Sequence, residues 1–348
     1  KCSCCGSRGS FWQGFCGSTY SPCHMKLSVR LLAWTVPVVY ASTHPAKDAL
    51  AELQNSLPED PQKWVMDRLA EAPNTPAGTP KVMIIGDSWA DVVSVGGNQS
   101  FFERKLKEHG CQVTSKCLAI PGSTSGMWVK GLVLSALKLA VRIYKPDYVW
   151  MTLVGNDALD SMPDCAKTGK SAKECADELI GTALPNIYKI VDAIHDAYPA
   201  ARVTGFGYDT MFGGLGCRLL THDIFPQCWS KNVPMGGGNR CFNTQFLRIQ
   251  QGWDWIAGNR SFVDPVSILG ATQVAAGDAK ASTDPKNRHI DMDAMGPAKY
   301  WPNYLACFHP SITPQNSDDN GAMVVMEEFY KVYWSKHLSC DTVKTLVV

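Results

Sequence analysis

The sequence has almost no net charge and no long hydrophobic segment. Its 33 Lys and Arg residues balance 32 Asp and Glu residues, which leaves a formal net charge of +1. No basic stripe with interleaved aromatic residues is present, so no nucleic acid and no anionic membrane surface is expected as a partner. No internal repeat is visible either. The chain has 348 residues, of which 45% are hydrophobic, and this is enough to bury a sizeable core in an α/β domain.

The most apolar run near the N-terminus, residues 31–39, is too short to cross a bilayer comfortably. Two basic residues precede it, and Val39 and Ala41 place small side chains at the positions of a cleavage site. We therefore expect residues 25–42 to be a secretory signal peptide and residues 1–24 to lie outside the mature protein. The protein is expected to be secreted, with no stable membrane span.

The 14 cysteines are divided into five before Met25 and nine after it. A secreted chain pairs most of its cysteines, and Cys165 and Cys175 close a short loop that is a candidate disulfide. Because nine is odd, one thiol is expected to lack a partner. The N-terminal cysteine cluster has no further Cys or His at finger spacing, so no metal site is predicted. Two sequons, at Asn98 and Asn259, predict glycosylation.

Strand and helix patterns alternate along most of the chain. Residues 43–80 hold an amphipathic helix, at about 47–70, and a Pro-rich linker. The following domain is predicted to span residues 81–340. Its expected strands are residues 82–85, 112–118, 147–155, 201–209 and 261–265. Its expected helices are residues 101–110 with Ser100 as cap, 129–143, 172–198, and a closing helix that starts near Asp318 or Asp319.

Continuous apolar strands separated by helices predict an α/β fold with a central parallel sheet covered on both faces. Ligands of such sheets bind beyond the carboxyl ends of the strands. Two long Gly/Pro-rich excursions, residues 209–258 and 264–308, are candidates for shaping a substrate site there.

Polar residues follow the strands at their carboxyl ends. Ser88 follows the first strand on a glycine turn, Gly122 follows the second, Asn156 follows the third, and His309 lies late in the chain. Ser88 can attack a carbonyl carbon while His309 takes and returns its proton. The backbone N–H groups of Ser88 and Gly122, with the Asn156 side-chain amide, can hold the developing oxyanion. These residue types, meeting at one sheet edge, predict acyl transfer.

Four short blocks in this order resemble the SGNH hydrolases, also called the GDSL esterase/lipase family. The blocks are Gly86-Asp87-Ser88, Gly122, Gly155-Asn156-Asp157 and His309, and the resemblance covers roughly residues 80–338. It implies a three-layer, flavodoxin-like sandwich. It also implies a serine nucleophile and a histidine base, with no cofactor and no metal. Asp87 and Asp157 are expected to have structural roles.

The chain departs from the family pattern at Ala306. The last block of the family normally has Asp three residues before the histidine, and the version Asp-Cys-Phe-His is familiar in phospholipase B-like members. Loss of this carboxylate costs serine hydrolases roughly 10⁴ in turnover. Three interpretations stay open. A backbone carbonyl orients His309 in a Ser–His dyad, or Asp291 or Asp293 substitutes for the missing acid, or catalysis is impaired.

Two functions are compatible with these residues. The first is a secreted serine esterase or lipase that hydrolyses carboxylic esters through an acyl-serine intermediate. Its substrate would be a small-molecule ester, a lipid or an acylated glycan. The second is a catalytically impaired protein of the same fold that binds a lipid or a glycan without cleaving it.

Overall fold

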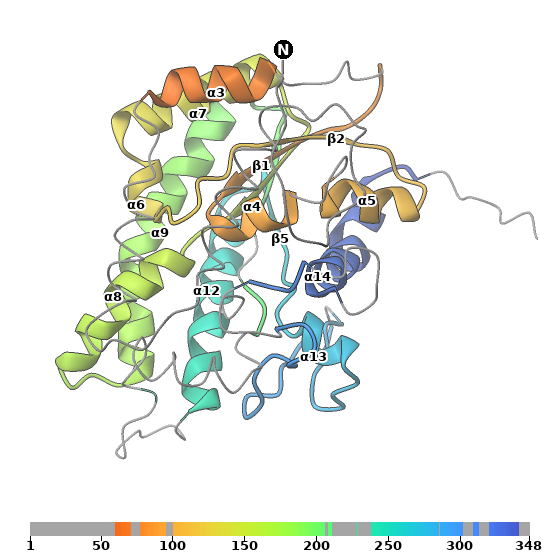
Figure 1. Cartoon of the computed structure of the whole chain (residues 1–348). Coiled ribbons are helices and arrows are strands. Elements are labelled where there is room, and N and C mark those ends of the chain that lie inside the picture. The colour runs from red at the N-terminus through yellow and green to blue at the C-terminus, as the bar shows by residue number, and fades with distance from the viewer. Residues whose placement is uncertain are drawn as a thin grey trace, which may run out of the picture. The chain divides into compact units, whose positions relative to one another are not determined.

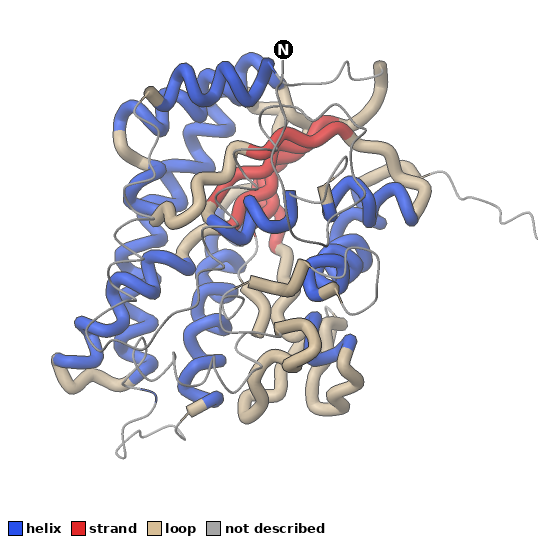
Figure 2. The backbone as a smooth tube through the Cα atoms, viewed as in Figure 1, coloured by secondary structure: helices blue, strands red, loops and turns tan. Residues whose placement is uncertain are grey.

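A parallel sheet of five strands, in the order β2-β1-β3-β4-β5, lies at the centre of the computed structural model (Figures 1 and 2). The structure describes residues 60–70, 77–94, 100–205, 208–210, 228, 238–284, 286–301, 309–312 and 320–340. The strands are β1 (Lys81–Gly86), β2 (Thr114–Cys117), β3 (Tyr148–Thr152), β4 (Arg202–Gly205) and β5 (Val263–Pro265). Each strand pairs with its neighbour in parallel register, which confirms the sheet expected from the sequence.

The central strand β1 shows why the sheet is covered on both faces. Its residues Val82, Met83, Ile84 and Ile85 are all 0% exposed, so side chains pointing to either face are buried. The chain goes from β1 outward to β2 and then back across β1 to β3. This reversal creates a crevice at the carboxyl ends of β1 and β3, where ligands bind in open parallel sheets.

Helices form one layer on each face of the sheet (Figures 1 and 2). One layer contains α7 (Gly131–Tyr144), α9 (Ala172–Ala197) and α12 (Asn239–Asn259), with α9 packed between the other two and α3 (Pro61–Ala70) packed on α7. The other layer contains α4 (Ser88–Ser94), α5 (Phe101–Glu108) and α14 (Gly321–Phe329). The three-layer α/β architecture is therefore confirmed.

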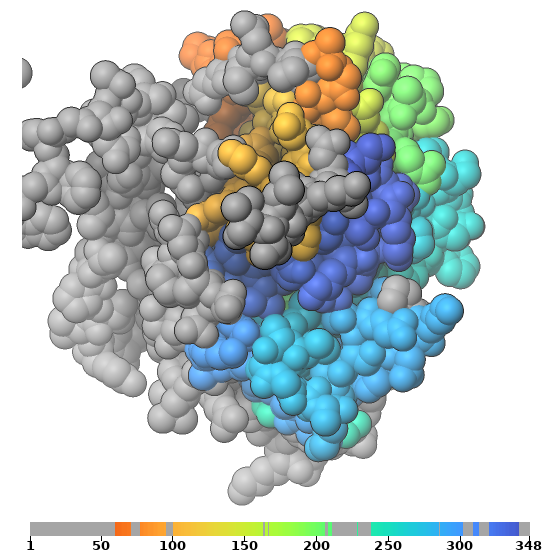
Figure 3. Space-filling model, turned by 90° about the vertical axis from the view of Figure 1, so that its right-hand side faces the viewer, coloured from red at the N-terminus to blue at the C-terminus, as the bar shows by residue number. Residues whose placement is uncertain are grey.

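The remaining elements are short or follow directly on others. They are α6 (Ser125–Trp128), α8 (Gly155–Lys167), α13 (Ala271–Ala275), the π-helix η2 (Tyr330–Trp334) and α15 (Ser335–His337). In Figure 3 the continuous C-terminal run of α14, η2 and α15 occupies the middle of the face, above the segment that carries α13. None of the helices in the described ranges is long and apolar enough to cross a membrane.

Two helical assignments differ from the sequence-based expectation. The segment 209–258, expected to be a Gly/Pro-rich excursion, contains most of α12, a helix of 21 residues. Its glycines are concentrated before Asn239, and the apolar spacing only begins after them. The closing helix starts at Gly321, and its cap is Asn320, whose side chain accepts the Met323 N–H at 3.0 Å. The helix therefore begins two to three residues after the expected start near Asp318 or Asp319. By contrast, Ser100 caps α5 as expected.

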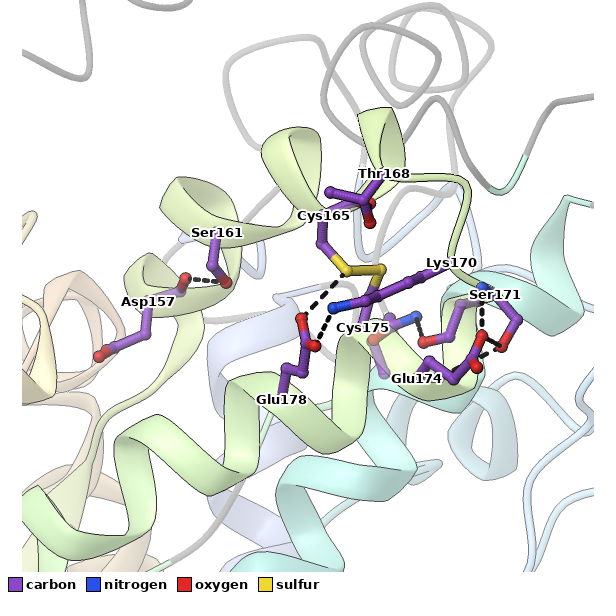
Figure 4. Close-up of a disulfide and its surroundings, with 11 residues drawn as sticks. Asp157, Ser161, Cys165, Thr168, Lys170, Ser171, Glu174, Cys175 and Glu178 are labelled. Atoms are coloured by element: carbon purple, nitrogen blue, oxygen red, sulfur yellow. Dashed lines mark hydrogen bonds and ion pairs between the residues drawn. A yellow bond between two sulfur atoms is a disulfide. The ribbon is translucent and has the colours of Figure 1, made fainter.

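Disulfides join segments that are close in sequence as well as distant ones. Cys165 and Cys175 are bonded, as expected, and tie the end of α8 to the first turn of α9 (Figure 4). The other two bonds described are Cys228–Cys241 and Cys111–Cys340. Cys117 is the free cysteine among the described residues. The predictions for the signal peptide, the upstream segment, Asn98 and Ala306 fall outside those residues.

Candidate active site

Ser88 is positioned by a close approach between β1 and β3. Gly86 has φ +134°, and a Cβ added there would lie 1.9 Å from the backbone oxygen of Thr152 in β3. The next residue, Asp87, donates its N–H to that same oxygen at 3.0 Å. Only glycine permits this turn, which places Ser88 at the sheet edge as the first residue of α4.

His309 contacts Ser88 directly. Its Nε2 lies 2.7 Å from the Ser88 Oγ, although the two residues are 221 positions apart. Burial lowers the pKa of His309 to about 4, so the ring is neutral at physiological pH. A neutral imidazole can accept the hydroxyl proton of Ser88. The pair thus has the geometry that a serine nucleophile and a histidine base require.

The two aspartates considered as substitute acids are engaged elsewhere. The carboxylate of Asp293 binds the guanidinium of Arg240, with distances of 2.9 and 2.6 Å. The carboxylate of Asp291 accepts the Asp293 N–H at 2.9 Å and lies 3.6 Å from Lys280 Nζ. Burial lowers the pKa of His309, and no carboxylate in the described ranges offsets it by raising that pKa.

Asn156 and the loop after β2 meet beside Ser88. Asn156 is buried, lines the same pocket as Ser88 and His309, and donates its Nδ2–H to the Ser123 carbonyl at 3.0 Å. Ser123 in turn donates its hydroxyl to the Gly86 carbonyl at 3.3 Å. Gly122, at φ +77°, forms the turn immediately before Ser123. These hydrogen bonds connect the three segments proposed to form the oxyanion hole.

Tyr208 is a site residue that sequence reasoning missed. Its hydroxyl accepts the Gly155 N–H at 2.7 Å and donates to the buried carboxylate of Asp87. A Cβ at Gly155 would lie 2.7 Å from the Tyr208 side chain, so glycine is required there too. Tyr208 thus bridges the residue before Ser88 and the residue before Asn156. Its place three residues beyond β4, at the same sheet edge, was the signal available in the sequence.

The backbone around this bridge is strained. Val154 has φ +97°, an unfavourable conformation for a β-branched residue. Burial also raises the pKa of Asp87 to about 7, even though the Tyr208 hydroxyl and the Trp89 N–H donate to its carboxylate. Strain and buried charge of this kind are concentrated at functional sites.

Asp157 contrasts with Asp87. Its carboxylate accepts the Ser125 N–H at 2.8 Å and the Ser125 hydroxyl at 2.6 Å. These bonds hold the start of α6 against the start of α8. Asp157 does not line the pocket, and its contacts are those of a structural residue, as expected.

The pocket at Ser88 has a polar end and an apolar wall. It contains about 480 Å³ of empty space, part of it open to solvent. The polar end is formed by Ser88, Asn156 and His309. The wall comes from one face of α8 and one face of α12, through Ala158, Leu159, Phe242, Phe246 and Ile249. The polar end and the apolar wall therefore adjoin each other in one small pocket.

In the ranges that the structure describes, no group of three or more His, Cys, Asp or Glu side chains is arranged to hold a metal ion.

The sequence matches no family model and no curated protein. Solved structures are similar only at a distance. A lipase from a goat rumen metagenome has 14% identity and a TM-score of 0.43, with 73% of this chain and 97% of that chain covered. An extracellular lipase from Streptomyces rimosus has 17% identity and a TM-score of 0.42, with 71% and 98% covered.

A third similar structure is the periplasmic domain of a lipopolysaccharide acetyltransferase from Salmonella ser. Paratyphi A. It has 12% identity and a TM-score of 0.44, with 84% of this chain and 98% of that chain covered. These likenesses are too distant to carry an argument about chemistry. The function proposed below therefore rests on this chain's own residues.

Proposed function

We propose that this protein is a serine esterase that hydrolyses carboxylic esters through an acyl-serine intermediate. The observation that carries the proposal is the 2.7 Å contact between Ser88 Oγ and His309 Nε2, at the polar end of an apolar pocket that Asn156 also lines. Nucleophile, base and amide donor are the parts that acyl transfer requires.

Each residue has a distinct role in the proposed reaction. Ser88 Oγ attacks the ester carbonyl carbon as His309 Nε2 takes its proton. The oxyanion is held by the Asn156 amide and by the backbone N–H groups of Ser88 and Gly122. His309 then returns the proton to the departing alcohol. Water, activated by the same ring, hydrolyses the acyl-serine and restores the free hydroxyl.

The absence of an Asp at position 306 is accommodated by a Ser–His dyad. The neutral state of His309 makes the ring competent to accept a proton without a carboxylate partner, although the imidazolium formed later has no carboxylate to stabilise it. The three disulfides described support secretion, because such bonds persist in oxidising compartments. Ester substrates of small molecules, lipids or acylated glycans all fit this chemistry.

A lipid- or glycan-binding protein without turnover is the second candidate function. Two observations favour it. Ala306 stands where the family pattern has Asp, and burial lowers the pKa of His309, which opposes formation of the imidazolium during the reaction. The pocket would then hold an apolar chain without cleaving it.

A fluorophosphonate probe distinguishes the two functions. Labelling followed by peptide mapping should place the adduct on Ser88, and Ser88→Ala should abolish both labelling and hydrolysis of a short p-nitrophenyl ester. Ser94→Ala, at the other end of α4, is the matched control and should retain both. If the folded wild-type protein is neither labelled nor active, the binding function replaces the esterase proposal.

A further inference from the structure

One glutamine interrupts the apolar wall of the pocket. Gln245 lies on α12 between Phe242 and Ile249, is 2% exposed, and lines the pocket beside Ser88. Its neighbours on that helix face are two phenylalanines and an isoleucine. An amide in this position is unusual, because buried polar groups are costly unless they are hydrogen-bonded.

Half of the Gln245 side-chain amide has a partner and half does not. Its Nε2 donates to the backbone carbonyl of Ala172 at 3.0 Å. This bond fixes the orientation of the carboxamide. The other atom, Oε1, is buried and has no hydrogen-bond partner within the described residues. It is therefore an acceptor with unused capacity.

The unused acceptor is specific to the pocket. Other buried polar atoms in the described residues also lack a partner, but Gln245 Oε1 is the one that belongs to a residue of the pocket lining. A buried acceptor without a donor destabilises a protein, and a ligand that supplies the donor recovers this loss.

The frame that holds Gln245 is rigid. Ala172 is the first residue of α9, where Ser171 and Glu174 form a capping box. The disulfide between Cys165 and Cys175 ties this first turn to α8, the other wall of the pocket (Figure 4). Because α9 also packs along α12, the acceptor is held in place before any ligand arrives, as a specificity-determining group should be.

We propose that Gln245 Oε1 accepts a hydrogen bond from the substrate, so that the preferred ester carries a hydroxyl or amide N–H part-way along an otherwise apolar chain. This inference rests on the proposed esterase function and narrows its substrate class. The apolar wall binds the chain, Gln245 recognises the donor, and Ser88 attacks the ester carbonyl.

Two series of p-nitrophenyl and alkyl esters test the proposal. In one series the acyl chain is either unsubstituted or carries a hydroxyl at successive carbons, and in the other the alcohol part is varied in the same way. We expect one positional isomer to exceed its unsubstituted parent by about 10-fold or more in kcat/KM. The series that contains this isomer shows which side of the ester enters the pocket.

The variant Gln245→Met keeps the volume and removes the acceptor. It should lose the preference, so that the ratio of kcat/KM between the hydroxylated isomer and its unsubstituted parent falls to about 1. Gln250→Met is the matched control, because Gln250 is a buried glutamine of the same helix outside the pocket lining. It should keep the preference. A flat series in the wild type, or a preference that survives Gln245→Met, would overturn the proposal.

Binding to Ser88→Ala separates this inference from the esterase function. Calorimetry with matched hydroxylated and plain fatty acids and alcohols requires no turnover and no substitution at Gln245. Tighter binding of one hydroxylated isomer supports recognition by Gln245 even if no ester is hydrolysed. Equal binding of all isomers counts against it even if Ser88 proves to be an active nucleophile.

Discussion

The acidic limb of the pH–rate profile is expected near pH 4. A general base must be unprotonated to accept a proton, and the pH dependence of kcat/KM reports its pKa in the free enzyme. Burial lowers the pKa of His309 from 6.5 to about 4. Hydrolysis should therefore stay level as the pH falls from 7 to about 5, where an ordinary histidine would already be mostly protonated.

The same burial is expected to slow the proposed reaction. A drop in pKa from 6.5 to about 4 means that the imidazolium of His309 is disfavoured by about 3 kcal/mol. Because the ring becomes positively charged in the transition state, this corresponds to a rate loss of up to about 300-fold. The His309 side chain is partly exposed, so solvent screening makes that figure an upper bound.

The variant Ala306→Asp tests the effect of burial on His309, since it supplies a carboxylate at the position where the SGNH pattern normally has Asp. The pKa of His309 should rise, which moves the acidic limb upward, and kcat should increase by about 10- to 300-fold. Ala200→Asp, in the exposed turn after α9, adds the same charge far from the sheet edge and should change neither quantity.

The assay is initial-rate hydrolysis of a short p-nitrophenyl ester between pH 3.5 and 9, quenched into alkaline buffer so that the product absorbs equally at every pH. NMR titration of the His309 ring in Ser88→Ala gives the pKa independently. A wild-type limb near pH 6.5 would refute the argument from burial. An unchanged rate and limb in a folded Ala306→Asp protein would show that no carboxylate at that position reaches the ring.

Three further outcomes follow from the contacts described. Tyr208→Phe removes both hydrogen bonds of the bridge while keeping the ring, so kcat should fall about 10- to 100-fold with little change in KM in steady-state kinetics. Tyr300→Phe, which alters another buried tyrosine, is the control. The folded-state pKa of Asp87, about 7, lies above its unfolded value of 3.8, so its contribution to stability is complete below pH 3.8 and lost as the pH rises through 7. Asp87→Asn should therefore flatten the fall in Tm between pH 5 and 8. Replacing Cys111 and Cys340 by Ser opens a loop with a sequence separation of 229 and should lower the free energy of unfolding by about 5 kcal/mol in urea denaturation; a loss below about 1 kcal/mol would contradict the loop-entropy argument.

Local patterns in the sequence were sufficient to predict several helices and strands. The apolar run 82–85 predicted the buried strand β1, and the Ser100 cap predicted the start of α5. Both signals can be read from neighbouring residues, because a continuous apolar run is typical of a strand buried on both faces and a cap side chain bonds within its own helix turn. The pairing of Cys165 with Cys175 belongs to the same group, since these residues are ten positions apart.

The contact between Ser88 and His309 was predicted through topology. Parallel strands place their carboxyl ends at one edge, so residues that follow different strands converge there. Helix α12 was missed, although Phe242, Phe246 and Ile249 have helical spacing. The glycine-rich stretch immediately before them is typical of a loop and obscures this periodicity.

The sequence by itself determined the alternation of strands and helices, the glycine turn before Ser88, and the order of the residues that meet at the sheet edge. Tertiary structure alone decided that Tyr208 bridges Asp87 and Gly155, and that Gln245 lines the pocket while its buried Oε1 has no hydrogen-bond partner among the described residues. The physical reason is the distance along the sequence over which each interaction acts. Periodicity and turn chemistry act between neighbours, whereas hydrogen-bond partners and burial depend on which helices the folded chain packs against the sheet.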